Sequence, residues 1–253
     1  MSDPVLVARC GLVPYSTALA AQRELAARRR DGELGDVLLL LEHPPVYTRG
    51  RRATADELPM GVEWYERQGI EVLDTDRGGR VTYHGPGQLV AYPIVALGAY
   101  DDDVHAYVRR LEQVMIGALA ELGVEAGLIE GQTGAWVGRP EDGVNPGPAA
   151  GPSTLGARKI GSIGIHVSHG VTTHGLAVNV SNDLQPFEWV VPCGIDSCAV
   201  TSVSRELGSE QGLESLAGPL VARYGEVFER EPIAADPSEL GLPLPAGRLE
   251  VSR

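Results

Sequence analysis

The sequence predicts a mixed α and β fold, because helical and strand patterns follow one another along a chain long enough for one large domain. At 253 residues, the chain fits a single large core. Apolar residues recur at helical spacing over 104–122 and 213–228, and short apolar or alternating runs separate these stretches. Helices interspersed with strands indicate a mixed α and β domain.

Each expected element has a local reason. The first helix is expected over 16–30, with Ser16 as a suitable N-cap and Gly32 beyond its end. The second covers 104–122, because three aspartates precede it and complement the positive end of the helix dipole. The third covers 213–228, whose inner face is apolar. Strands are expected at 36–41, 70–73, 88–95, 134–137, 160–167 and 175–180.

Composition along the chain predicts the domain organisation. Residues 1–230 are expected to form one domain, interrupted by a mobile loop over 139–157 that is rich in glycine and proline. The tail 231–253 is rich in proline and charge, and we expect it to be poorly packed. The longest purely apolar run, 37–41, is too short for a membrane span of about 20 residues. No signal-peptide pattern opens the sequence, which predicts a cytoplasmic protein.

The charge balance excludes some classes of partner. The chain carries 34 acidic and 21 basic residues, a formal net charge of −13. Such a charge disfavours non-specific binding to nucleic acid or to an anionic membrane, so neither is expected as a partner. The three cysteines are odd in number and few, which disfavours a disulfide framework and fits a reducing compartment.

Lysine usage singles out one residue. Of the 21 basic residues, only Lys159 is a lysine, and it precedes an alternating strand pattern over 160–167. Arginine cannot replace an amine that exchanges protons, because it stays charged at any usable pH. Lys159 is therefore a candidate catalytic residue, although a solvated lysine is the ordinary alternative.

Cys193 is the matching candidate nucleophile. It lies in a Pro192-Cys193-Gly194 turn, 34 positions after Lys159. A nearby ammonium stabilises a thiolate and lowers the pKa of a cysteine from about 8.5, and the same amine can carry a proton. The two residues would form a complete acyl-transfer pair if the fold brings them together.

A glycine-rich segment over 77–88 predicts a binding wall at a strand edge, because glycines let backbone N–H groups approach a ligand closely. It matches neither the phosphate loop nor the dinucleotide fingerprint. His166, His169 and His174 lack supporting carboxylate or cysteine ligands at metal-binding spacing, so no metal and no cofactor is expected. These three histidines and His84 are candidate general bases if Cys193 belongs to a hydrolase.

Four ordered motifs carry a family resemblance. They are Arg77-Gly78-Gly79 with Thr82 and His84-Gly85-Pro86-Gly87-Gln88, then Lys159-Ile160-Gly161, then Thr173-His174-Gly175-Leu176-Ala177-Val178-Asn179-Val180, then Pro192-Cys193-Gly194. In these segments the chain resembles the octanoyltransferase, or lipoyl(octanoyl) transferase, family. The resemblance implies the fold of biotin and lipoate protein ligase catalytic domains, with a larger and a smaller β-sheet flanked by helices around an acyl tunnel.

The resemblance also implies a reaction, partners and site residues. Octanoyl-acyl carrier protein would be the donor, and lipoyl domains of 2-oxoacid dehydrogenase complexes and the glycine cleavage H protein would be the acceptors. Cys193 would carry the acyl thioester in a ping-pong reaction, and Lys159 would lower its pKa. The acyl group would contact three segments: Arg77, Gly78, Gly79, Arg80, Val81, Thr82, Tyr83 and His84; Ser162, Ile163 and Gly164; and Gly175, Leu176 and Ala177.

Because acyl carrier proteins are acidic, we expect a local basic docking patch on this acidic chain. Its expected members are Arg49, Arg51, Arg52, Arg77 and Arg80.

Three alternative functions stay open at this point. An ATP-dependent lipoate or biotin ligase shares the implied fold, but it needs no thiol at Cys193, and the biotin-ligase signature GRGRxGRxW is absent. A cysteine thioester hydrolase would use the same nucleophile with water as the acceptor. A silent binding protein for octanoyl or lipoyl groups would need neither Cys193 nor Lys159.

Overall fold

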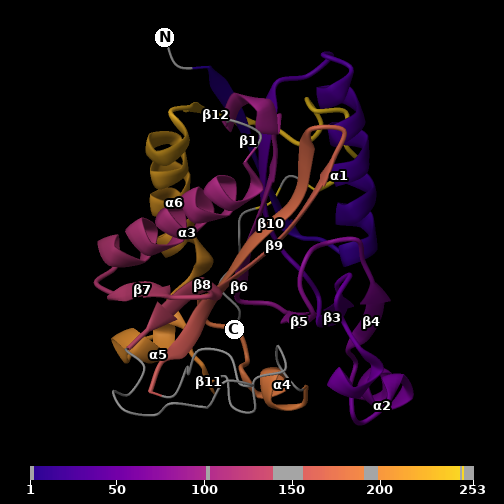
Figure 1. Cartoon of the computed structure of the whole chain (residues 1–253), viewed down its shortest axis with the longest axis vertical. Helices are drawn as coiled ribbons and strands as arrows, with labels where there is room; N and C mark the ends of the chain where they lie inside the picture. Colours follow the sequence, from indigo (N-terminus) through magenta and orange to yellow (C-terminus); the bar gives the residue numbers. More distant parts are fainter. Residues whose placement is uncertain (1–2, 101–102, 139–155, 191–198, 246, 248–253) are drawn as a thin grey trace.

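A large mixed sheet runs through the molecule (Figure 1). The structure is a computed structural model that describes residues 3–100, 103–138, 156–190, 199–245 and 247. In spatial order, the strands of this sheet are β12 (Glu231–Ala235), β1 (Pro4–Leu12), β2 (Asp36–Glu42), β6 (Gln88–Ile94), β10 (Val171–Asn179), β9 (Arg158–Ser168), β8 (Gln132–Val137) and β7 (Ala126–Ile129). A short strand, β11 (Ala199–Val200), pairs in parallel with β9 outside this order.

A smaller sheet lies beside the large one. It consists of β4 (Glu71–Asp74), β3 (Val46–Arg49) and β5 (Val81–His84), in that order. The two sheets, with helices around them, confirm the predicted fold class, a mixed α and β domain with a larger and a smaller sheet.

Helices cover both faces of the large sheet. Helix α1 (Tyr15–Arg30) packs on one face, and α3 (Val104–Glu121) and α6 (Leu213–Phe228) pack together on the other (Figure 1). The shorter elements are α2 (Val62–Arg67), α4 (Gln185–Glu188), α5 (Val203–Leu207) and the 3₁₀ turns η1 (Ala55–Glu57) and η2 (Leu97–Tyr100). Among the residues described, no helix is long and apolar enough to cross a membrane.

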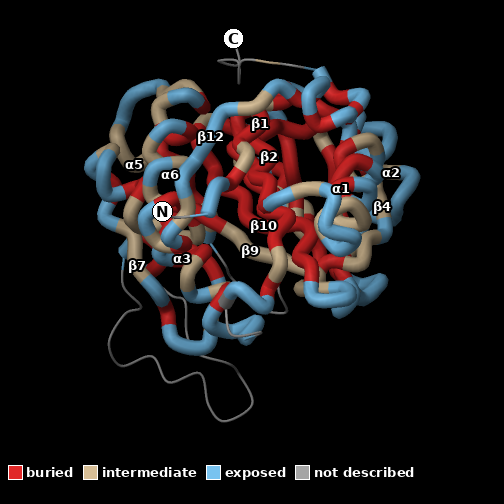
Figure 2. The backbone as a smooth tube through the Cα atoms, turned by 90° about the horizontal axis from the view of Figure 1, so that it is seen from above, coloured by how far each residue is buried: buried red, intermediate tan, exposed pale blue. Residues whose placement is uncertain are grey.

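Strand β2 shows why the centre of the large sheet is buried. Its seven residues are all buried, because successive side chains point to opposite faces and both faces are covered. Leu38 and Leu40 pack with α3 and α6, whereas Leu39 and Leu41 pack with α1. Figure 2 shows this buried strand and its neighbour β1 between the exposed outer elements. The strand predicted over 36–41 from the apolar run 37–41 is therefore confirmed, and both of its faces are buried.

The predicted helices are confirmed, with one correction. The bounds 213–228 match α6, and the side chain of Asp103 caps α3 by accepting hydrogen bonds from the backbone N–H groups of His105 and Ala106. Ser16, however, is not the N-cap of α1. The helix begins one residue earlier, because Pro14 has a φ of −53° suited to the helix entry and its carbonyl accepts the N–H of Ala18 at 3.0 Å.

The prediction for the C-terminal tail is wrong over its described part. Residues 231–235 form β12, which pairs in parallel with β1. Leu240, Leu242 and Leu244 are buried in the core beneath α1. Proline and charge dominate the composition of the tail, but three leucines at alternate positions give it one apolar face. The loop predicted to be mobile, 139–157, lies outside the described residues except for 156 and 157.

Candidate active site

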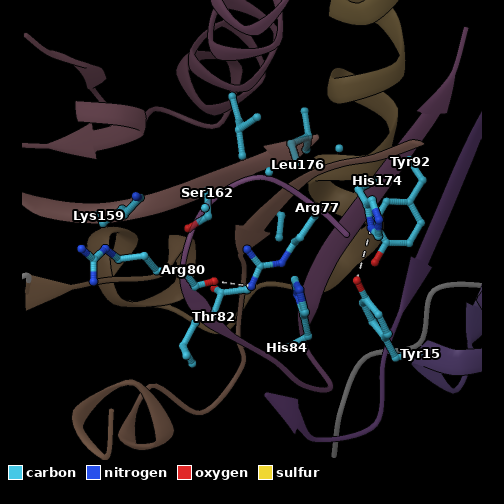
Figure 3. A pocket seen from close by; sticks show the side chains of 16 residues that line it. Tyr15, Arg77, Arg80, Thr82, His84, Tyr92, Lys159, Ser162, His174 and Leu176 are labelled. Atoms are coloured by element: carbon cyan, nitrogen blue, oxygen red, sulfur yellow. Dashed lines mark hydrogen bonds between the residues drawn. The ribbon is translucent and has the colours of Figure 1, made fainter. Parts of the chain in front are cut away.

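A narrow cavity of about 90 Å³ opens where the two sheets meet the start of α1 (Figure 3). It is lined by Tyr15 of α1, by Arg77, Gly79, Arg80, Val81, Thr82 and His84 on and before β5, by Tyr92 of β6, by Lys159, Ser162, Ile163 and Gly164 of β9, and by His174, Gly175, Leu176 and Ala177 of β10. At roughly 10–15 Å³ per water, it has room for about six to nine water molecules. It is a slot rather than an open cleft.

The cavity brings together most of the residues expected to contact an acyl group. Twelve of those fourteen residues line it, and so does Lys159. Gly78 and Tyr83 do not. Gly78 donates its N–H to the carbonyl of Ile165, and the Tyr83 ring packs against Tyr47 and Phe187 within the small sheet's core. Cys193 lies outside the described residues.

Lys159 is positioned by strands on both sides of β9. Trp136 of β8 pairs with it in register, and the Lys159 Nζ lies 5.1 Å from the centre of the indole ring. This geometry is a cation–π contact. Gly134 leaves the space that the lysine occupies, since a Cβ there would lie 2.9 Å from Lys159 Cε. On the other side, Val200 of β11 pairs with Lys159.

Arg77 holds the glycine-rich segment in shape. Its guanidinium is buried and donates to the carbonyls of Thr48, Gly78 and Arg80 at 2.6, 2.9 and 2.7 Å, and to the Thr48 hydroxyl. A cation that satisfies several carbonyls of one turn fixes the path of that turn. Arg77 therefore forms part of the cavity wall and is not exposed for docking.

The expected docking patch is smaller than predicted. Arg77 is buried, Arg80 pairs with the buried carboxylate of Glu57, and Arg49 pairs with Asp74 at 2.8 Å. The exposed members are Arg51 and Arg52, in the turn that follows β3.

His84 is held in one tautomer by a chain of side chains. The Asn179 amide donates to the carbonyl of Thr201 at 3.0 Å, so its oxygen accepts from the Gln88 amide at 2.9 Å. The Gln88 oxygen then accepts from His84 Nδ1 at 2.6 Å. His84 Nε2 is left as the unprotonated nitrogen of a residue that lines the cavity. Burial and the neighbouring His43 hold the pKa of His84 well below 6.5, so the ring stays neutral at physiological pH.

His174 closes the opposite end of the cavity from Lys159 (Figure 3). Its Nε2 donates to the Asp76 carboxylate at 2.8 Å, and its Nδ1 accepts from the Tyr15 hydroxyl at 3.2 Å. Burial lowers the pKa of His174 to about 4 despite the opposing effect of Asp76. Burial also lowers the pKa of His43 to about 4, and this ring accepts from the Tyr92 hydroxyl at 2.8 Å. The cavity thus ends in neutral, hydrogen-bonded aromatic rings.

Three lining residues were not among the expected acyl contacts: Tyr15, Tyr92 and His174. The two tyrosines lie in a helix and a buried strand, where an aromatic residue ordinarily indicates core packing. His174 belongs to a motif that carried the family resemblance, and that motif was the available signal for it. Among the described residues, no group of three or more His, Cys, Asp or Glu side chains is arranged to hold a metal ion, and His166 and His169 do not line this cavity.

Comparison with known proteins places most of the chain in one family. Residues 14–224 match the family described as the lipoyl protein ligase A/B catalytic domain. An octanoyltransferase of Chloroflexus aurantiacus is 45% identical over 223 residues, which cover 88% of this chain and 93% of the relative. An octanoyltransferase of Corynebacterium aurimucosum is 43% identical over 244 residues, which cover 96% of this chain and 86% of the relative.

Solved structures share the fold at low sequence identity. A bi-partite lipoate protein ligase of Thermoplasma acidophilum is similar with a TM-score of 0.67 and 17% identity, over 93% of this chain and 87% of that one. A lipoate-protein ligase A bound with ATP has a TM-score of 0.65 and 17% identity, over 93% and 89%. At this identity the likeness shows the fold alone.

Proposed function

We propose a function on the premise that this chain belongs to the family of lipoyl protein ligase A/B catalytic domains. The protein is an acyltransferase that moves an octanoyl group from octanoyl-acyl carrier protein, through a thioester on Cys193, to the lysine of a lipoyl domain. Its acceptors are the lipoyl domains of 2-oxoacid dehydrogenase complexes and the glycine cleavage H protein. The observation that carries the proposal is Lys159, the chain's one lysine, which lines a slot bordered by the family's motifs in a chain 45% identical to an octanoyltransferase.

The first half-reaction exchanges one thioester for another. The Cys193 thiolate attacks the octanoyl carbonyl, and the bond to the carrier's sulfur breaks. Lys159, as an ammonium, stabilises the thiolate beforehand and gives its proton to the departing carrier thiolate. The exchange is nearly balanced in free energy, so the acyl-enzyme keeps its activation and no nucleotide is required.

The second half-reaction forms an amide. The acceptor lysine attacks the Cys193 thioester as a free amine, the carbon–sulfur bond breaks, and the neutral Lys159 takes the proton that the amine loses. This step returns the ammonium and thiolate to their starting states. Aminolysis of a thioester is downhill, which drives the overall transfer.

Chain connectivity supports the pairing of Cys193 with Lys159. Cys193 precedes Ala199 by six residues, and Ala199 opens β11, whose next residue pairs with Lys159. Six residues span at most about 22 Å, so the covalent chain keeps Cys193 within reach of the lysine's neighbourhood.

The lining of the slot suits a saturated chain. Val81, Ile163 and Leu176 supply apolar walls beside glycines that add no side chains. Burying each methylene contributes roughly 0.8 kcal/mol, so an eight-carbon chain provides enough binding free energy to hold the acyl group during transfer.

Intact-protein mass spectrometry tests the proposal. The protein is mixed with octanoyl-acyl carrier protein without ATP, then chased with an apo lipoyl domain. We expect a mass gain of one octanoyl group that disappears on the chase, while the lipoyl domain gains the same mass. Cys193→Ser and Lys159→Ala should abolish or strongly reduce the adduct.

Cys10→Ser is the matched control, because Cys10 is fully buried and burial raises the pKa of its thiol to about 12. It should form the adduct as the wild type does. Acylation that requires free octanoate and ATP, with no adduct on Cys193, would identify a ligase instead. Release of octanoate at the same rate with or without the lipoyl domain would identify a hydrolase.

A further inference from the structure

A second cavity of about 230 Å³ lies near the His174 end of the slot. It is bounded by Arg23, Ala26, Ala27 and Arg30 of α1, by His166, Ser168, His169, Val171 and Thr173 of the β9–β10 hairpin, and by Asp76. The two cavities lie close together, because adjacent residues of the chain line different ones. Arg77 and His174 line the slot, whereas their neighbours Asp76 and Thr173 line the second cavity.

The His174 ring lies between Tyr15, which lines the slot, and Asp76, which lines the second cavity. The ring is 1% exposed, and its two nitrogens are bonded to Asp76 on the side of the second cavity and to Tyr15 on the side of the slot. Its ring is nearly parallel to that of Tyr15, at an angle of 20°, and stands at 89° to that of Tyr92 (Figure 3). The ring cannot turn aside without losing both hydrogen bonds, which hold it in this orientation.

The backbone at His174 is bent in a way that aims this ring. Its φ is 58°, inside a strand, a conformation that residues with a Cβ rarely adopt. The His174 N–H donates to the Gln22 side chain at 2.6 Å, outside the ladder of the sheet. Unfavourable backbone conformations persist where the surrounding structure holds them, commonly at functional sites.

The His174 ring lies at a fixed distance from Lys159, the end of the slot at which the reaction is proposed. His174 pairs with Ile165 across the β9–β10 ladder, six residues along β9 from Lys159. At about 3.3 Å per residue, this is at most about 20 Å between the Cα atoms of Lys159 and Ile165, because the register shifts between Lys159 and Gly161, and the lysine side chain occupies part of this length. An extended alkyl chain advances about 1.3 Å per carbon, because its carbon–carbon bonds are about 1.5 Å long, so eight to ten carbons span about 10–13 Å.

We propose that His174 is the specificity-determining residue that sets the maximum length of the acyl chain. The acyl carbonyl lies at Lys159, the chain follows β9 and β10, and its terminal methyl group meets the His174 ring. Asp76 and Tyr15 are positioning residues that hold this ring across the slot. The direction of the chain rests on the proposed function, whereas the His174 ring and the second cavity near it are features of the fold.

The test measures binding of free saturated fatty acids of 6 to 16 carbons by calorimetry, which requires no acyl transfer. In the wild type, the dissociation constant should fall about fourfold for each added carbon up to a limit, and then stop improving or worsen. In His174→Gly the ring between the slot and the second cavity is removed, so the improvement should continue for several more carbons. Glycine tolerates the φ of 58°, which removes the backbone reason for this variant to misfold.

Two further variants secure the comparison. His174→Asn is shorter and tolerates the same backbone, and it should extend the limit if the glycine variant fails to fold. Thr173→Ala enlarges the second cavity without removing the His174 ring and should leave the limit unchanged. Circular dichroism and the melting temperature verify that each variant is folded.

An unchanged length limit in folded His174→Gly and His174→Asn would overturn the proposal. So would a wild-type dissociation constant that keeps falling about fourfold for each added carbon from 8 to 16 carbons. Failure of the proposed function would be a separate result. A wild type that binds the fatty acids in this pattern but gains no octanoyl mass from the carrier protein would contradict the proposed transfer. It would not contradict the role of His174 in limiting the chain length. With transfer established, the same shift toward longer chains should be seen in the acyl-enzyme masses.

Discussion

At the scale of single residues, the proposed mechanism gives Lys159 two tasks that a substitution can separate. Arginine keeps the positive charge beside Trp136 but cannot give up a proton at any usable pH. We therefore expect Lys159→Arg to form acyl-enzyme slowly and to transfer it to the lipoyl domain at least about 100-fold more slowly than the wild type. Single-turnover measurements of the two half-reactions test this. Equal slowing of both by Arg and by Ala would contradict separate roles for charge and proton transfer.

The buried histidines make stability depend on pH. His43 and His174 each have a folded-state pKa of about 4, lowered mainly by burial, against 6.5 in the unfolded chain. Between these values the unfolded state binds more protons, so the free energy of unfolding falls as the pH falls. The contribution of each of these two histidines to the free energy of unfolding is fully present above pH 6.5 and amounts to about 3 kcal/mol. Urea unfolding at pH 7.5, 6 and 5 should show this decline, and a flat profile would contradict it.

The candidate site could be predicted in part from single residues. Lys159 is conspicuous because the chain uses arginine at its other 20 basic positions, and the segment from Arg77 to His84 is conspicuous for its glycines. Tyr15 and Tyr92 could not be predicted, because an aromatic residue in a helix or a buried strand has the same local pattern whether it faces a core or a cavity. That difference arises only when α1, β6 and β10 meet.

At the scale of elements, strand β8 supports the lysine through Gly134. The φ of Gly134 is 121°, and a Cβ at this position would collide with the Gly161 carbonyl and crowd Lys159 Cε. We expect Gly134→Ala to lower the free energy of unfolding by about 1–3 kcal/mol and to displace Lys159, so that acyl transfer falls further than the loss of folded protein explains. Gly127→Ala on neighbouring β7 is the control, because nothing lies within 4 Å of its Cβ position. Equal effects of the two substitutions on transfer would contradict this role.

The C-terminal tail contributes to the core, although its composition did not indicate this. Leu242 is 4% exposed beneath α1, whereas Ile233 on the edge strand β12 is 42% exposed. Leu242→Ala should lower the free energy of unfolding by about 2–3 kcal/mol, and Ile233→Ala by much less. Chemical denaturation of both variants tests this. Similar small losses for both would mean that the tail adds little to the core.

The prediction of helices and strands from the sequence succeeded where one or both faces of the element are buried in the core. Strand β2 and helix α6 have long apolar patterns, and their predicted bounds agree with the structure to within one residue. Strands β1, β3, β5, β7, β11 and β12 were not predicted. Most of them depend on distant partners, such as β1 for β12 and β5 for β3, and pairing between segments far apart in the chain leaves no local period to detect.

At the scale of the whole molecule, the net charge of −13 opposes the approach of an acidic carrier protein. With such a carrier as the proposed donor, docking would depend on local positive charge. Arg51 and Arg52 are exposed in the turn after β3, where β3 pairs with the slot-lining strand β5. Reversing one of these charges changes the local field within about 10 Å at moderate salt, with little effect on the fold.

We therefore expect Arg51→Glu and Arg52→Glu each to raise the KM for octanoyl-acyl carrier protein several-fold at low salt, while the KM for a small neutral octanoyl thioester stays the same. The difference should shrink as salt is added, because screening removes the repulsion and the attraction alike. Arg30→Glu, an equal charge change at the exposed end of α1, is the control and should have little effect on either KM. If all three variants raise the KM for the carrier protein equally, the total charge of the molecule governs the encounter and these two arginines form no docking site.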